Sequence, residues 1–366
     1  MMRTFFKRYW KRHLWLLTDL ALLGLFVLLR SRTGVMNRFT GMVSSPLRQA
    51  AGRLCFCVGF SVAEVLCVLL VLAAAGYLCW SVFTIVRGRG HRAVRTYEAL
   101  LGLACGALTL GVIFCWFWGA DYYTDSFQDR SGIHARPVAE EDLLRVTVYF
   151  AQQTALTADA VERDEHGVFA VPREEILLKS PHAYDVLEQT FPFLDFADTG
   201  VKPVRLSRVM SMLDFTGVYC PYTGEPNVNM DSPSCMLPAT AAHEMAHQRG
   251  YASEQECNFL GILASTTCGH PAYAYSGWLT GYIYLSNALY RVDRDLYWEI
   301  RHGLPDPVEA DLAANTAYWD RFRDTVVQKA SNHVYDGMLK AYGQENGIQS
   351  YGTVVDLLVA YYGEML

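Results

Sequence analysis

The stretch His243-Glu244-Met245-Ala246-His247 decides the fold and chemistry of the chain's C-terminal part. Residues four apart lie on one face of a helix, so both imidazoles can reach one metal ion. Glu244 follows the first histidine directly and can reach a water bound to that metal. This is the H-E-x-x-H arrangement of zinc metallopeptidases. The chain has only 10 histidines among 366 residues, which argues against a surface helix with coincidental histidines.

A third metal ligand should follow the motif, because catalytic zinc takes three protein ligands and keeps one position for water. Gly250 suits a left-handed turn at the end of the motif helix. Glu254 begins the next helix and is the preferred ligand, with Asn258 four residues on as its hydrogen-bond partner. Glu256 is the alternative, although Ser253 and Glu256 have the spacing of a capping box, which would occupy Glu256. A metzincin would have its third histidine at position 253, so that ligand set is excluded.

Charge divides the chain near residue 118. Residues 1–118 hold 14 Lys and Arg against 3 Asp and Glu, whereas residues 119–366 hold 17 against 34. Long apolar runs fill the first part, each close to the roughly 20 residues that a bilayer span requires. A signal peptide would also explain the first run, but no small-residue cleavage site follows it cleanly. We expect transmembrane helices near residues 13–30, 57–86 and 98–118.

Basic residues predict the orientation of these spans. Five Lys and Arg lie within residues 3–12, and four Arg lie within residues 87–95. The positive-inside rule places both segments in the cytoplasm, although the first loop also carries five arginines. We therefore expect a multi-pass protein of the cell membrane with a cytoplasmic N-terminus and an extracytoplasmic domain over residues 119–366. Only Asp19 and Glu64 are ionisable in mid-span, which argues against a channel or transporter.

The C-terminal domain is expected to be mostly helical. Helices are expected over 140–157, 306–330 and 350–363, with short elements at 185–193 and 206–215. Residues 218–230 predict two short strands around a Thr-Gly turn, which could pair with an extended substrate or form a structural hairpin. Residues 257–290 hold no Asp, Glu, Lys or Arg. They predict two buried helices, because His270-Pro271 and four glycines interrupt what would otherwise be a fourth span.

Several further residues are candidates for contacts with a substrate or transition state. They are Tyr219, Asn227 and Asn229 of the strand segment, and Tyr273 and Tyr275 of the uncharged segment. Six of the ten cysteines lie in or beside the spans, where they are expected to act as small apolar residues. Cys220 and Cys235 could form a disulfide in an oxidising compartment or remain free thiols.

The motif block resembles the bacterial family called domain of unknown function 3810. The likeness rests on Gly217-x-Tyr219-x-Pro221-x-Thr223-Gly224-Glu225-x-Asn227-x-Asn229, on the run from His243 to Phe259, and on Tyr275-Ser276-Gly277. The three-span order and the closing Ser350-Tyr351-Gly352 also fit, so the resemblance covers nearly the whole chain. It implies three membrane spans and a zincin-like outer domain, without an established substrate. The family commonly has Ala at Cys257, and the Glu-x-x-x-Asn spacing is similar to gluzincins, which favours Glu254 as ligand.

These observations predict a mainly α protein in two domains. Residues 1–118 would form the membrane domain, and residues 119–366 a zincin-like, mostly helical α+β metallopeptidase domain. The expected function is zinc-dependent hydrolysis of peptide bonds, with His243, His247 and Glu254 as ligands and Glu244 as general base. A non-catalytic zinc-binding receptor, sensor or scaffold is the alternative. Peptides or proteins and the membrane are the expected partners, and the acidic outer domain argues against nucleic acid.

Overall fold

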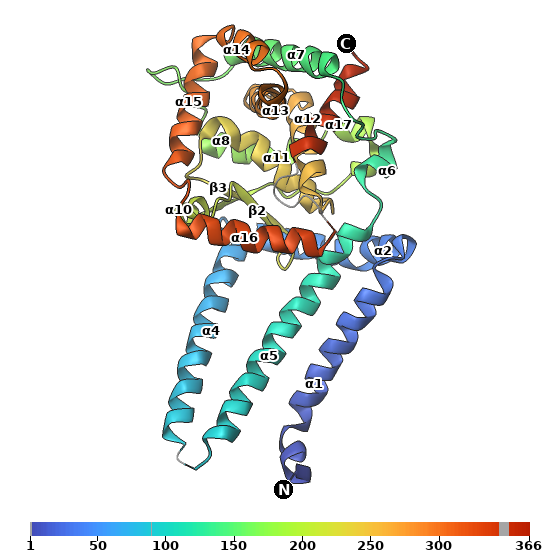
Figure 1. The fold of residues 1–366 in the computed structure, drawn as a ribbon, viewed down its shortest axis with the longest axis vertical. Coiled ribbons are helices and arrows are strands. Elements are labelled where there is room, and N and C mark those ends of the chain that lie inside the picture. The colour runs from blue at the N-terminus through green and yellow to red at the C-terminus, as the bar shows by residue number, and fades with distance from the viewer. Residues whose placement is uncertain (1, 89, 344–350) are drawn as a thin grey trace. The chain divides into compact units, whose positions relative to one another are not determined.

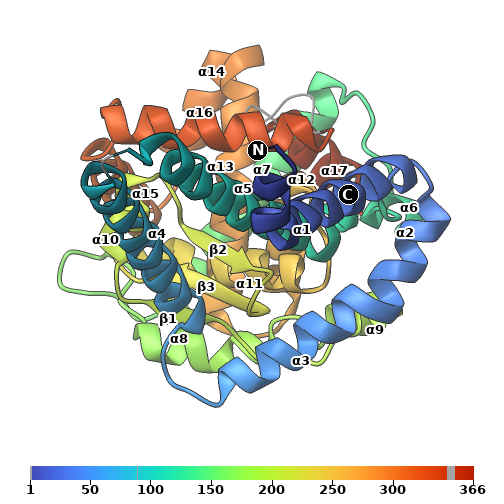
Figure 2. The same ribbon diagram turned by 90° about the horizontal axis from the view of Figure 1, so that it is seen from below.

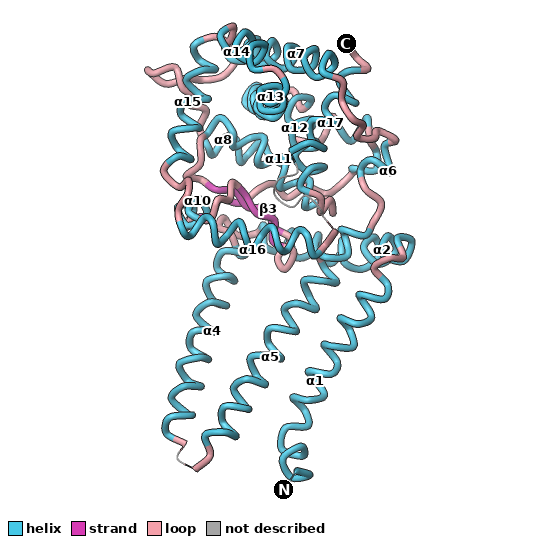
Figure 3. Tube along the Cα trace, in the orientation of Figure 1, coloured by secondary structure: helices cyan, strands magenta, loops and turns pink. Residues whose placement is uncertain are grey.

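A computed structural model describes residues 2–88, 90–343 and 351–366 of the chain. Helices dominate it, and the strands are few and short (Figure 3). The chain forms two compact units, the first from residues 1–48 and 62–124 and the second from residues 49–61 and 125–366. The division expected at residue 118 therefore falls a few residues later, and a short segment between the first two spans belongs to the second unit.

The first unit contains three helices that are long and apolar enough to cross a membrane, as the sequence predicted (Figure 1). They are α1 (Met2–Leu29), α4 (Val62–Arg87) and α5 (Arg92–Phe117), and the candidate span within α1 is Lys7–Leu29. The second span begins later than residue 57, because residues 57–61 form a turn around Gly59. The third begins at Arg92, earlier than the expected residue 98, so that Arg92 and Arg95 lie in its first turn.

The segment between the first two spans is also helical, which the sequence patterns did not predict. It comprises α2 (Thr33–Phe39), the π-helical turn η1 (Thr40–Ser44) and α3 (Ser45–Phe56). Within the first unit, Arg48 forms a buried ion pair with Asp121 of the 3-10 turn η2 (Gly119–Tyr123). Between α1 and α5, the Thr109 hydroxyl donates to Asp19 Oδ2 at 2.8 Å, so this intramembrane carboxylate has a polar partner.

The second unit is built from helices around one small sheet. Its helices are α6 (Phe127–Ser131), α7 (Glu140–Ala158), α8 (Arg173–Lys179), α9 (Leu187–Thr190), α10 (Ser207–Met212), α11 (Leu237–Gln248), α12 (Glu254–Thr267), α13 (Pro271–Val292), α14 (Arg294–His302), α15 (Asp306–Asp320), α16 (Val326–Ala341) and α17 (Tyr351–Gly363). Short 3-10 turns are η3 (Ser180–His182), η4 (Pro192–Leu194) and η5 (Ser234–Met236). The expected helix over 306–330 is thus two helices, and Ser350 of the expected last helix lies outside the described residues.

The sheet has three strands in the order β1-β3-β2. The strands are β1 (Lys202–Val204), β2 (Gly217–Cys220) and β3 (Glu225–Asn229). β1 runs parallel to β3, and β2 runs antiparallel to β3, with which it forms a hairpin. Gly224 has a φ of 69°, the left-handed conformation that the hairpin turn requires of one residue. Helix α11 lies against β2 and β3 (Figure 2).

The core of the second unit is formed by α11, α12 and α13, with α7 and α17 packed against α13. Glycines allow the close helix contacts: a Cβ at Gly281 would lie 2.2 Å from the Phe150 ring, and one at Gly277 would lie 2.7 Å from Ser265 Cβ. Residues 257–290 are therefore two buried helices, as predicted. Their lack of charge reflects burial in protein.

Candidate metal centre

Helix α11 presents His243, Glu244 and His247 from one buried segment. The helix begins at Leu237-Pro238, where a proline in the first turn loses no intrahelical hydrogen bond. It ends at Gln248, and Gly250 has a φ of 92° that turns the chain back toward α12. One helical turn separates the two imidazoles, whose centroids are 4.8 Å apart. The spacing in the sequence therefore places both rings on one face.

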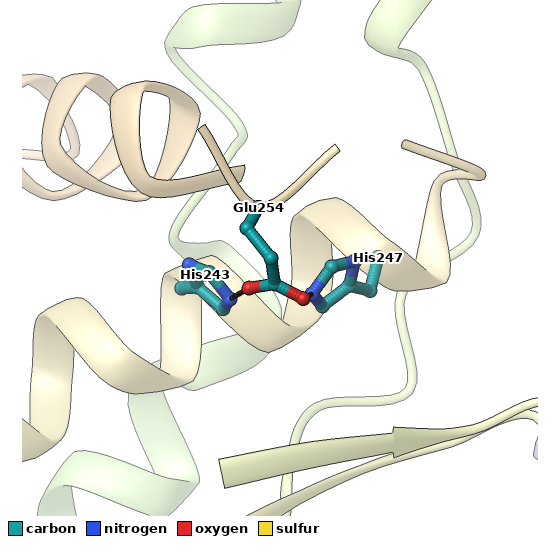
Figure 4. A group of neighbouring side chains, drawn as sticks. All are labelled: His243, His247 and Glu254. Carbon is teal, nitrogen blue, oxygen red and sulfur yellow. Dashed lines mark ion pairs between the residues drawn. The ribbon is translucent and has the colours of Figure 1, made fainter. Parts of the chain in front are cut away.

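Glu254 is the first residue of α12, and its carboxylate lies between the two imidazoles (Figure 4). Glu254 Oε2 is 3.3 Å from His243 Nε2, and Glu254 Oε1 is 3.4 Å from His247 Nε2. One ligand atom from each of the three residues lies within 4.8 Å of the others. The structure thus brings together the three residues that the sequence proposed as metal ligands.

The donor atoms of this group are of the kinds that zinc binds, and they lie close enough together to hold a metal ion. Zinc binds nitrogen and oxygen ligands at roughly 2.0–2.2 Å, so two ligand atoms of a tetrahedral site lie about 3.3 Å apart. Each imidazole nitrogen has one oxygen of the Glu254 carboxylate near that separation, Oε2 at 3.3 Å for His243 and Oε1 at 3.4 Å for His247. Two imidazoles and one carboxylate are also the donor set of catalytic zinc sites. His243, His247 and Glu254 can therefore hold zinc.

Contacts at Nδ1, the ring nitrogen that does not face the metal position, hold the orientation of His247. Its Nδ1 lies 2.7 Å from the carbonyl oxygen of Tyr251 and 3.2 Å from Cys257 Sγ. Hydrogen bonding at Nδ1 directs Nε2 toward the metal position and stabilises the required tautomer. Burial raises the pKa of the Cys257 thiol to about 12, so it stays protonated and adds no charge. Cys257 thus touches a candidate ligand.

Glu244 lies against Gly217 of β2. A Cβ at position 217 would be 2.4 Å from Glu244 Oε1, so only glycine leaves room for the carboxylate. Glu244 is 4% exposed, and its Oε2 has no hydrogen-bond partner among the described residues. Burial raises the pKa of this carboxyl to about 7, while the neighbouring histidines lower it. An unpartnered buried acceptor next to the ligand pair suits proton transfer.

Glu256 faces away from the histidines. Its Oε1 accepts from the backbone N–H of Gln128 at 3.2 Å, and burial raises the pKa of its carboxyl. Ser253 stands at the N-cap of α12 without a side-chain capping bond. The predicted capping box is therefore wrong, because the free N–H groups at the start of α6 compete for Glu256. Of the two candidate third ligands, the structure brings Glu254 to the metal position.

The hydrogen-bond partner of Glu254 is Tyr335. The Tyr335 hydroxyl on α16 donates to Glu254 Oε1 at 2.5 Å. Asn258, the partner expected from its spacing, makes no hydrogen bond to Glu254 among the described residues. Tyr335 lies 81 residues beyond Glu254 in the chain. No local pattern could have indicated it, because only the fold brings α16 to this place.

The predicted substrate contacts separate into two groups. Tyr219 is on β2, and its backbone is hydrogen-bonded to Glu244. Asn227 and Asn229 instead hold the sheet: Asn227 Nδ2 donates to Glu225 O at 2.8 Å, and Asn229 Nδ2 donates to Ser211 Oγ at 2.9 Å. Both amides are buried and serve the sheet itself.

The two tyrosines of α13 are core residues. The Tyr273 hydroxyl donates to the carbonyl of Ile176 at 2.8 Å, and the Tyr275 hydroxyl donates to Asp311. Both residues are at most 1% exposed. Tyr275 also stacks on Phe169, whose N–H donates to Asp311 at 2.7 Å. Tyr275 thus belongs to a buried polar cluster and does not contact the histidines.

Arg249 secures the end of the motif helix and was not among the residues predicted from the sequence. Its guanidinium donates to both carboxylate oxygens of Asp198 at 2.7 and 2.6 Å, and to Glu188 at 2.7 Å. It also lies 3.7 Å from the ring centre of Tyr184. A fully buried charge is tolerated only with such partners. The signal in the sequence was an arginine two residues after the motif, in an otherwise buried segment.

All ten cysteines carry free thiols. The charged groups that influence the Cys235 thiol are Asp311 and Arg163. The Cys220 thiol is influenced instead by Glu225, and it in turn influences the Cys55 thiol. The two cysteines considered for a disulfide therefore lie in different environments.

Comparison with known proteins gives one family. The sequence signature of the family described as "Protein of unknown function (DUF3810)" matches residues 39–359. No curated protein and no solved structure matches the chain. The matched region includes the second and third candidate spans, the sheet, and every residue of the candidate metal centre. The chain therefore belongs to the DUF3810 family.

Proposed function

We propose that this protein is a membrane-anchored zinc metallopeptidase with a zincin-like outer domain. One observation carries the proposal: ligand atoms of His243, His247 and Glu254 converge within 4.8 Å, beside the buried carboxylate of Glu244. A purely structural zinc site usually has four protein ligands and needs no adjacent base. Three converging ligands with a carboxylate beside them favour catalysis.

The roles of the residues follow from their chemistry. Zinc held by the two histidines and Glu254 supplies Lewis acidity. Glu244 takes a proton from the attacking water as the water oxygen bonds to the peptide carbonyl carbon. Glu244 then returns this proton to the amide nitrogen as the C–N bond breaks, leaving an acid and an amine. Burial raises the pKa of the Glu244 carboxyl above its usual range, which favours its taking up and returning the proton.

The position of β2 supports a peptide substrate. β2 is an edge strand of the sheet, and its residue Gly217 touches Glu244. The backbone of Tyr219 on this strand is already bonded to Glu244, and an extended peptide can add to the remaining backbone groups of an edge strand. A peptide held in this way would pass beside the carboxylate proposed as the base.

Zinc analysis and proteolysis of the purified full-length chain test the proposal. We expect one zinc per chain in wild type and none after the double substitution His243→Ala and His247→Ala. Glu244→Gln should retain zinc and lose at least about 100-fold in the rate of cleavage of a peptide library. Near-stoichiometric zinc in the double variant would refute the site. Zinc binding without any peptide cleavage by wild type would favour a non-catalytic sensor or scaffold.

A further inference from the structure

Helix α16 belongs to the second unit and packs against the rest of that unit through one face. The four side chains Gln328, Ser331, Asn332 and Tyr335 are spaced at i, i+3, i+4 and i+7, which places them in one row. Other side chains of the helix are exposed to solvent, with Val326 at 84% and Val334 at 72%. The contacts made by this row therefore determine the orientation of α16.

The row contacts the loop between α10 and β2. Gln328 Nε2 and Asn332 Nδ2 both donate to Asp214 Oδ2, at 2.9 and 3.0 Å. Ser331 Oγ donates to the carbonyl of Leu213 at 2.8 Å. Asp214 has a φ of 69°, a left-handed conformation that orients its carboxylate from a tight turn. Three polar side chains thus hold α16 to one short loop.

Tyr335 ends the row and contacts both the loop and the metal centre. Its ring packs edge-on against Phe215 with centroids 5.5 Å apart, and its hydroxyl reaches Glu254 Oε1 at 2.5 Å. That separation is within the range of charge-assisted O–H···O⁻ hydrogen bonds. The ring is therefore held by the loop while the hydroxyl contacts the candidate ligand.

Glu254 needs such a partner. It is the first residue of α12, its side chain is 28% exposed, and Ser253 provides no capping bond beside it. A glutamate side chain at a helix start has several rotamers of similar energy. Residues that do not bind the metal themselves often donate hydrogen bonds to metal-binding carboxylates and hold them in the binding geometry.

We propose that Tyr335 is a positioning residue that holds Glu254 between His243 and His247 and thereby sets the affinity of the metal centre. The inference rests on the proposed zinc site. It makes that site depend on the docking of α16, a helix that lies far along the chain from the motif.

Two variants on α16 separate the hydroxyl from the docking of the helix. Tyr335→Phe removes the hydrogen bond to Glu254 and keeps the ring against Phe215. Ser331→Ala is the matched control, because it removes one docking hydrogen bond four residues earlier and leaves Tyr335 in place. Zinc affinity of the full-length chain is measured by competition with a chromophoric chelator. We expect a 10- to 100-fold loss for Tyr335→Phe and a change within about twofold for Ser331→Ala.

Cobalt(II) substitution supplies a readout of ligand geometry. The visible absorption bands of the cobalt-loaded chain should shift in Tyr335→Phe and match wild type in Ser331→Ala. Thermal unfolding of the chelator-treated variants should occur at most about 2–4 °C below wild type, because each variant loses a single hydrogen bond.

The outcomes distinguish the inference from the function on which it rests. Wild-type zinc affinity and an unchanged cobalt spectrum in Tyr335→Phe would overturn the role of Tyr335 and leave the zinc site standing. An equal loss in both variants would assign the effect to docking of α16 and also overturn it. A wild-type chain that binds no zinc would remove the proposed function itself.

Discussion

Gly217 is the residue on which the placement of Glu244 depends. A methyl group there would lie 2.4 to 2.8 Å from three atoms of the Glu244 side chain, closer than real contacts allow. We expect Gly217→Ala to displace the carboxylate and lower kcat/KM for peptide cleavage by about 10- to 100-fold, because small misplacements of a catalytic group are costly. Zinc content, measured alongside, should stay at one per chain. An unchanged kcat/KM would show that Glu244 does not act from this position.

Arg249 supports the same helix through charge. Replacing it with methionine would leave Asp198 and Glu188 without their shared cation, and breaking a buried pair in this way costs about 3–5 kcal/mol. Arg323→Met is the matched control, because its ion pair with Asp320 is exposed and worth at most about 1 kcal/mol. Denaturant unfolding of the two variants measures the difference. Equal stabilities would mean that the Arg249 network contributes nothing.

Sequence spacing predicted the ligands but not their partners. His243 and His247 lie on one helical turn, so their proximity follows from local geometry alone. Glu254 follows after one short turn, which limits where it can point. The partners depend on the tertiary fold. Tyr335 donates the hydrogen bond to Glu254 that was expected from Asn258. Glu256 accepts from the backbone N–H of Gln128 and not from that of Ser253. Spacing rules fail where a residue distant in the chain offers a competing bond.

At the scale of elements, α11 and α12 approach closely at Gly261. A Cβ there would lie 2.9 Å from the backbone nitrogen of His243 and 3.2 Å from the carbonyl of Ala239. Neither atom belongs to a flexible side chain, so Gly261→Ala should push α12 away from α11. Because α12 carries Glu254 and α11 carries both histidines, we expect at least about a 10-fold loss of zinc affinity.

Gly337→Ala is the control for this helix contact. Gly337 lies within α16, and a Cβ added there would have no atom within 4 Å. Alanine should therefore fit and favour the helix by up to about 1 kcal/mol. The zinc affinity of this variant should match wild type in the same chelator competition. If Gly261→Ala also bound zinc like wild type, the spacing of the two helices would not govern the site.

Composition predicted some elements well and others poorly. Hydropathy found three spans because a bilayer demands long uncharged helices, and the Thr-Gly turn indicated the hairpin. The helices over residues 33–56 escaped notice because the segment is short, basic and amphipathic between two stronger signals. The expected helix over 306–330 breaks at residues 321–325, where Asp324 has a φ of 62°. Aspartate tolerates that conformation, so no glycine or proline marked the break.

For the whole molecule, the two parts of the chain differ in the sign of their charge. The first 118 residues carry an excess of 11 positive charges, and the rest carry an excess of 17 negative charges. Basic residues near spans favour the cytoplasmic side, whereas acidic ones contribute little to orientation. The boundary drawn from charge lies close to the boundary of the compact units at Thr124. Residues 49–61 depart from it because Lys202 of β1 donates to the carbonyls of Cys55 and Val58.

Membrane topology is the prediction that belongs to the whole chain. Three spans place the two ends on opposite sides, and the arginines at positions 87, 89, 92 and 95 favour a cytoplasmic turn between the second and third spans. A reporter inserted at His91 should therefore be cytoplasmic, and one inserted near Lys340 should be outside. The five arginines of the first loop oppose this arrangement, so replacing the four turn arginines with glutamine should yield a mixed population. Reporter activity at both positions in intact cells measures the orientation. A cytoplasmic reporter near Lys340 in the wild-type chain would reverse the predicted topology and place the candidate metal centre inside the cell.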